Sequence, residues 1–161
     1  ADTDKVKISY WVGGYIGKNK DLKVLIDNVE MQQLSESELL NGSFESGSGK
    51  NDIYSWHLTS KSMQNEPVEQ NWVANYTMER EPNGYHGAAV AVTRHGIGYV
   101  TLDSNRIKVE AGSTYIIDLA FRIQNVDENF EAVHVYIAEY DKKGERLTPI
   151  SFSSRYTNKQ T

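Results

Sequence analysis

The chain has 161 residues, of which 39% are hydrophobic and 24% are charged, which is typical of a soluble globular protein. Its net charge of -5 disfavours nucleic acid and anionic membranes as partners. The absence of cysteine excludes a disulfide scaffold and thiolate chemistry. No apolar run approaches the roughly 20 residues that span a bilayer, and no secretory signal is visible. We therefore interpret the N-terminal Ala-Asp as a mature end or the end of an excised fragment.

Short strand patterns follow one another along the chain. Residues 6–12 alternate between two kinds of side chain, as in a strand with two different faces. Turn sequences separate the later candidates, and no stretch has sustained helical periodicity. The pattern predicts an all-β fold, a β-sandwich jelly roll of two antiparallel sheets, in one domain spanning residues 1–161. We expect further strands at residues 22–31, 56–58, 72–78, 88–93, 98–102, 105–109, 115–124, 132–140 and 150–156.

A search for catalytic motifs gives no positive result. The four histidines lack the spacing of a zinc hydrolase motif. There is also no nucleophile elbow, phosphate-binding loop or dinucleotide fingerprint. We therefore expect that the protein is not an enzyme.

Several short strings point to a known kind of domain. Residues 39–45 (LLNGSFE), here called the opening motif, precede a Gly/Ser loop and Trp56. A Tyr-His-Gly string at residues 85–87 leads into an apolar strand, and residues 109–144 read as a hairpin. Residues 26–31 (IDNVEM) are called the closing motif. Together these strings resemble the galactose-binding-like jelly-roll carbohydrate-binding modules appended to bacterial xylanases and other polysaccharidases. By this resemblance, we expect Trp56 to pack beneath the opening motif.

The order of the two motifs departs from the family, in which the closing strand comes last. One explanation is a circularly permuted domain, in which residues 1–34 supply the closing strands and residues 35–161 the remainder. The other is that residues 1–34 are the tail of a preceding module, with completion by strand exchange between chains. We prefer the permuted domain, because its length suits one module and jelly-roll termini usually lie close together.

The resemblance also implies a structural Ca²⁺ ion, which prefers carboxylate and carbonyl oxygens. The carboxylates would be Asp27 of the closing motif and Glu45 of the opening motif. Backbone oxygens near Ser43 and His86 would complete the shell. Alternatively, Asp27 is a turn carboxylate and Glu45 an exposed strand residue. If the ion is present, the two motifs must meet in space.

Strand parity predicts a sugar-binding surface. In residues 115–124 and 132–140, one face of each strand is apolar and should be core, and the other carries polar groups. Aromatic rings stack on sugars, and Arg and Gln bond hydroxyls or carboxylates. If these strands are neighbours in one sheet with residues 6–12, their polar faces form one concave surface of Trp11, Arg122, Gln124, His134 and Tyr136, with Trp72, Tyr76 and Arg155 at its edge. Alternatively, Trp11 plugs the end of the sheet and Arg122 pairs with Asp118 at the surface.

These features predict a carbohydrate-binding module of a secreted, extracellular bacterial polysaccharidase. It would hold a parent catalytic domain, such as a glycoside hydrolase, near its polysaccharide. The Arg and His content favours an anionic polysaccharide, while neutral β-glucan and xylan remain open. The alternative is a structural or adhesive jelly-roll domain without sugar affinity.

Overall fold

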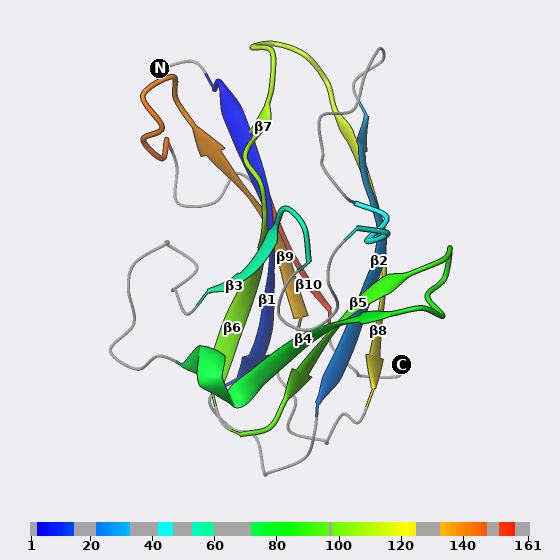
Figure 1. The fold of residues 1–161 in the computed structure, drawn as a ribbon. Helices are drawn as coiled ribbons and strands as arrows, with labels where there is room; N and C mark the ends of the chain where they lie inside the picture. Colours follow the sequence, from blue (N-terminus) through cyan, green and yellow to red (C-terminus); the bar gives the residue numbers. More distant parts are fainter. Residues whose placement is uncertain are drawn as a thin grey trace.

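Two antiparallel sheets face each other in the computed structural model of this chain (Figure 1). The structure describes residues 3–14, 22–32, 42–46, 53–59, 72–96, 98–124, 133–147 and 152–156. The expected all-β sandwich is therefore confirmed. Within these ranges, no helix has the length and apolar composition needed to cross a membrane.

The two sheets differ in size. Sheet A has six strands, and its pairing order is β10 (Phe152–Tyr156), β9 (Val133–Tyr140), β1 (Lys5–Gly14), β6 (Gly98–Ser104) and β3 (Trp56–Thr59), with β7 (Ile107–Lys108) also paired to β1. Sheet B has the order β4 (Tyr76–Glu81), β5 (Ala89–Arg94), β2 (Lys23–Gln32) and β8 (Ile116–Gln124). A 3-10 turn, η1 (Trp72–Asn75), precedes β4 where the sequence predicted a strand.

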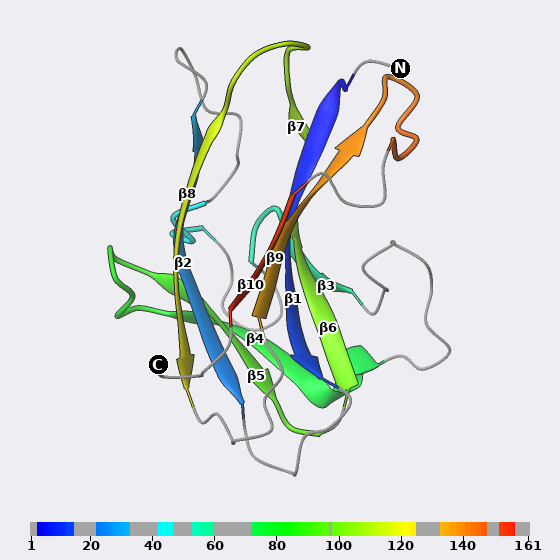
Figure 2. The same ribbon diagram turned by 180° about the vertical axis from the view of Figure 1, so that it is seen from behind.

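The two N-terminal strands lie inside the sheets. β1 pairs with β9 on one side and β6 on the other, so that Trp11 lies opposite both His134 and Thr101. β2 lies between β5 and β8 in the same way, with an irregularity in its register between Asp27 and Glu30. The first two strands of this chain therefore lie in the middle of the two sheets (Figure 2).

The expected pairing of residues 115–124 with residues 132–140 is wrong. β8 pairs with β2 in sheet B, whereas β9 pairs with β1 and β10 in sheet A. Both strands do turn their apolar rows toward the same core, as parity predicted. Two strands that face each other across a sandwich show the same alternation as two that pair side by side, so alternation alone cannot assign them to one sheet.

The core fills the space between the sheets and reaches under the opening motif. Trp56 and Phe44 are almost fully buried, and their ring centroids are 5.2 Å apart. Tyr10 of β1 also packs against Trp56, with 6.2 Å between the two ring centroids. Trp56 thus packs beneath the opening motif, as expected.

Tyr76 belongs to this core, so its predicted place at the edge of a sugar site is wrong. Its side chain is 3% exposed, and its hydroxyl contacts the carbonyl oxygens of Gly98 at 2.7 Å and Val12 at 3.2 Å. Burial raises the pKa of the Tyr76 hydroxyl far above its usual value, although the nearby Arg94 guanidinium opposes the shift. The group therefore remains a hydrogen-bond donor that ties sheet B to β1 and β6.

Replacing Tyr76 with Phe tests this role, because the ring stays and only the hydroxyl is lost. We expect the free energy of unfolding in urea to fall by about 1–3 kcal/mol, since the buried carbonyl group of Gly98 loses its donor. Tyr85→Phe, at a ring that is 76% exposed, is the matched control and should leave stability unchanged. Equal stability of the two variants would contradict the assignment.

Candidate functional site

Five rings gather on the outer face of sheet A, away from the core. This aromatic cluster consists of Trp11, Trp72, Tyr99, His134 and Tyr136. Ring centroids are 5.0 Å apart for Trp11 and Tyr99, and 5.0 Å for Trp11 and His134, whose rings meet edge to face. Trp72 packs edge to face on Tyr99 at 4.8 Å.

Strand register explains why these rings meet. Trp11 on β1 lies opposite His134 on β9 and opposite Thr101 on β6. Tyr99 lies two positions before Thr101 and so points to the same face of the sheet. Gly98 admits the ring of Trp72, because a Cβ atom at Gly98 would lie 2.3 Å from it. The buried base of the aromatic cluster consists of Trp11, Tyr99 and Tyr136, which are 3–8% exposed. The other two rings, Trp72 and His134, are half-buried.

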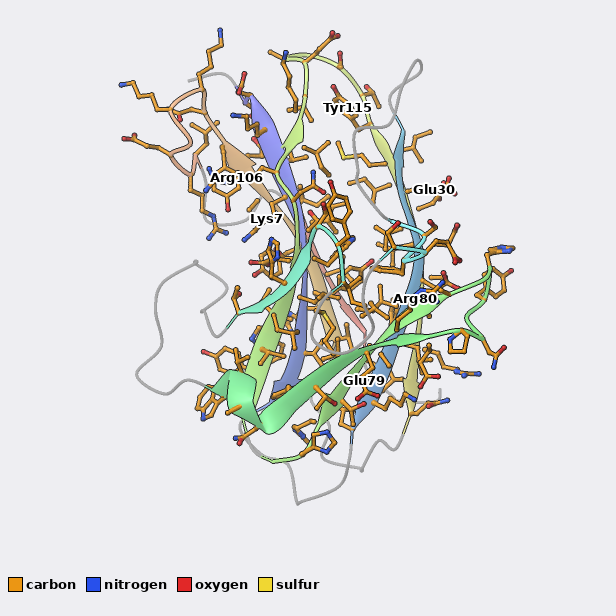
Figure 3. All side chains as sticks on the ribbon, in the orientation of Figure 1. Lys7, Glu30, Glu79, Arg80, Arg106 and Tyr115 are labelled. Atoms are coloured by element: carbon orange, nitrogen blue, oxygen red, sulfur yellow. The ribbon has the colours of Figure 1, made fainter. Side chains whose placement is uncertain are left out.

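A charged and polar cluster lies in the next row of the same face. Asp103 is 6% exposed, and its carboxylate accepts hydrogen bonds from Ser9 Oγ at 2.6 Å and Lys7 Nζ at 2.7 Å. Lys7 is labelled in Figure 3. Thr59 Oγ1 lies 3.4 Å from the same carboxylate. Lys7, Ser9, Thr59 and Asp103 are called the polar cluster below.

Tyr136 connects the two clusters, since it belongs to the aromatic cluster and lies opposite Ser9 in the sheet register. Burial raises the pKa of Tyr136 to about 12, and the negative charge of Asp103 adds to the shift. The hydroxyl therefore stays protonated at neutral pH. This face combines apolar ring surface with a carboxylate, an ammonium group and hydroxyls.

The structure divides the predicted sugar site between the two sheets. Trp11, His134 and Tyr136 share the outer face of sheet A, and Trp72 lies at their edge. The backbone of Arg155 lies beside His134 in the register of β10. Arg122 and Gln124 are on β8, which belongs to sheet B, so their predicted place on the same surface is wrong. The error follows from the mistaken pairing of β8 with β9.

Sequence reasoning missed Tyr99 and Asp103. Both lie in β6, where polar and aromatic side chains alternate with Val100 and Leu102 of the core. This alternation is visible in residues 98–104 and is the same parity signal used for residues 115–124 and 132–140.

The opening and closing motifs meet on one edge of sheet B. The backbone N–H of Val29 donates to the carbonyl of Gly42 at 2.9 Å. Asp27 Oδ2 accepts from the N–H of His86 at 2.8 Å, and Glu45 Oε1 accepts from the N–H of Ala88 at 2.7 Å. Two carboxylates, eighteen positions apart in sequence, thus hold the same turn at residues 82–87.

The two carboxylates of the predicted calcium shell differ in their hydrogen bonding. Asp27 is 3% exposed, and within the described part of the chain its Oδ1 atom has no hydrogen-bond partner. Both oxygens of Glu45 are engaged, because Arg80 Nη2 lies 2.6 Å from Oε2. Arg80 also donates from Nε to the carbonyl oxygen of Phe44 at 2.9 Å. Within the described residues, no three His, Cys, Asp or Glu side chains gather as a metal site.

Comparison with known proteins gives a limited result. No family model matches the chain, and no solved structure matches it significantly. The chain is 27% identical over 138 residues to the mannose-6-phosphate isomerases of Saccharomyces cerevisiae and Eremothecium gossypii. The match covers 77% of this chain but only 29% of each relative. This similarity is too low to assign the chain to their family.

These relatives contradict the expectation that the protein is not an enzyme, because both are named for an enzyme. We therefore withdraw that expectation. It rested on the absence of short catalytic motifs, and residues that are far apart in sequence can still assemble an active site.

Glu45 provides a test of the turn. The hydrogen bond from Ala88 N–H, supported by Arg80, lowers the pKa of Glu45 below 4.5, although desolvation opposes the shift. A lowered folded-state pKa adds stability above pH 4.5, and that stability is lost as the pH falls through the folded-state pKa. We expect Glu45→Gln to reduce the melting temperature at pH 7 and to flatten its decline in acid. Glu110→Gln, at an exposed acid outside this turn, is the control. An unchanged acid decline in Glu45→Gln would contradict the assignment.

Proposed function

We propose that the chain is a carbohydrate-binding domain that engages its ligand on the outer face of sheet A. The observation that supports this proposal is the aromatic cluster next to the polar cluster. A pyranose has an apolar face that stacks on aromatic rings and hydroxyls that bond to polar groups. Trp72 and His134 are the half-buried rings through which a sugar can reach this face.

The cost of burying charge supports a functional role for the polar cluster. Lys7 and Asp103 have side-chain exposures of only 12% and 8%, and they lie on the face that does not belong to the core. A buried ion pair contributes little to stability, because the loss of hydration offsets most of the attraction between the charges. A ligand with several hydroxyls would gain preoriented partners from such a pair.

A second candidate follows from the two isomerase relatives, whose names specify a phosphorylated sugar. This candidate also requires sugar recognition, so the two proposals can share one surface. The alternative without sugar affinity is a structural or adhesive domain. For the first proposal, the partner is a polysaccharide, with an anionic polymer favoured, and the domain would serve a parent catalytic domain in a secreted bacterial protein.

Affinity electrophoresis of the whole chain across acidic and neutral polysaccharides tests the proposal. We expect retardation by at least one polymer and about a tenfold loss of affinity in Trp72→Ala, as removal of a stacked ring costs about 1.4 kcal/mol. Tyr54→Ala, at a ring that is 57% exposed elsewhere, is the matched control and should bind normally. Absence of retardation by every polymer would favour the structural domain.

A turnover assay on mannose 6-phosphate distinguishes the second candidate. Conversion to a ketose phosphate that is lost in Trp72→Ala would favour an isomerase at this surface. Polysaccharide retardation without conversion would favour the binding domain.

We also propose a structural Ca²⁺ ion at the junction of the two motifs. Asp27 Oδ1 fits such an ion, because it is a buried carboxylate oxygen without a partner. Glu45 and backbone oxygens near Ser43 and His86 would complete the shell, with Glu45 exchanging Arg80 for the metal. The ion would neutralise Asp27 and join β2 to the turn at residues 82–87.

Chelation tests the calcium proposal. We expect a chelator to lower the melting temperature and added Ca²⁺ to restore it, because a ligand that binds the folded state stabilises it. Asp27→Asn should abolish this response, whereas Asp118→Asn, at an exposed residue of β8, should retain it. A melting temperature that is unchanged by the chelator would overturn the proposal.

A further inference from the structure

A separate cavity of about 320 Å³ lies on the outer face of sheet B, on the opposite side of the sandwich from the aromatic cluster. A cavity of this volume falls in the range used by small-molecule sites. Its lining includes Asp27, Asn83, Tyr85, Ala89, Ala120 and Arg122. We call it the Tyr85 pocket.

Small side chains form the floor of the Tyr85 pocket. Leu25 of β2 packs with Ala89 and Ala91 of β5 in a cluster that is separate from the core. Ala120 lies opposite Asp27 in the register of β8. Alanine at positions 89 and 120 leaves a trough beside Leu25, and Tyr85 and Arg122 contribute longer side chains to its lining.

Tyr85 stands at this trough on a turn that is held by several hydrogen bonds. Gly84 N–H donates to the carbonyl of Gly87, and the carboxylates of Asp27 and Glu45 bind the backbone of His86 and Ala88. The ring of Tyr85 is nevertheless 76% exposed, although it meets His86 edge to face at 4.3 Å. A rigid turn that presents an exposed ring is preorganised for stacking, because little entropy is lost on binding.

Arg122 supplies a cation to the opposite wall of the pocket. It lies opposite Leu25 in the sheet register, and it forms no ion pair with a carboxylate of the described residues. Its partner is Gln124, whose amide oxygen, when turned toward the guanidinium, accepts from Nη2 at 3.0 Å and Nε at 3.3 Å. Gln124 thus takes the side of the guanidinium, and the end formed by Nη1 and the second hydrogen of Nη2 can still bind a carboxylate in fork geometry.

We propose that the Tyr85 pocket is a second saccharide site that selects sugars carrying a carboxylate. The Tyr85 ring stacks on the sugar, Arg122 pairs with the carboxylate, and Asn83 bonds a hydroxyl. The proposal shares a ligand class with the proposed function but uses another sheet, so either site can fail without the other. A chain with both sites would contact an acidic polysaccharide on two faces.

The test measures binding of glucuronic acid and glucose to the whole chain by NMR titration, since these two sugars differ at the carboxylate. We expect tighter binding of glucuronic acid, with chemical-shift changes in residues 83–87 and 120–122. Tyr85→Ala should weaken binding of both sugars about tenfold. Arg122→Gln should remove the preference for the acid and leave the affinity for glucose unchanged. Lys142→Gln, which removes an exposed cation from a distant turn, is the charge-matched control and should keep the preference.

Three outcomes would overturn the proposal. The first is the absence of shifts around the pocket with glucuronic acid. The second is a preference for the acid that survives Arg122→Gln. The third is a preference that disappears with chelator in the unmodified chain, because a metal ion at Asp27 would then bind the carboxylate in place of Arg122. Trp72→Ala should leave these titrations unchanged, which separates this site from the aromatic cluster.

Discussion

The insertion of β1 and β2 into the middle of the two sheets is the constraint on which the rest of the structure depends. Without β1, the pair β9–β10 has no ladder to β6, and without β2, β8 has no ladder to β5. The same strands bring the candidate sites together. β1 carries Trp11 to the aromatic cluster and Lys7 to the polar cluster, and β2 carries Asp27 to the turn that presents Tyr85.

Two buried carboxylates, Asp103 and Asp27, differ in how many hydrogen-bond partners compensate their charge. The carboxylate of Asp103 accepts hydrogen bonds from the ammonium group of Lys7 and the hydroxyl of Ser9, so its charge is compensated within sheet A. Asp27 has one backbone N–H on Oδ2 and no partner on Oδ1, so its charge is compensated only in part. A buried carboxylate oxygen without a donor is costly. Asp103 is therefore held in place by its partners, whereas Asp27 keeps a buried oxygen without a donor among the described residues.

The sequence predicted the strands and their core faces well, because alternation along a single strand reports its own burial. Residues 115–124 and 132–140 were assigned the correct inner rows, but not the correct sheets. Sheet membership depends on pairing between residues that are distant in sequence, and alternation carries no information about it. The prediction that Tyr76 lies at the edge of a sugar site was wrong for a related reason. A tyrosine at the start of a strand can lie in the core as readily as at the edge of a binding site. The meeting of Asp27 and the turn was foreseen only through the family resemblance.

The central position of β1 also determines the order in which the protein can fold. During synthesis, β1 is made before the strands that flank it, and it gains its second neighbour only when β9 appears more than a hundred residues later. Until then, a strand rich in apolar and aromatic residues has at least one open edge, which is prone to pair with other chains. Contacts of this sequence separation also slow folding, because the chain must close a long loop before they form. β1 therefore keeps an unpaired edge until most of the strands of sheet A have been made.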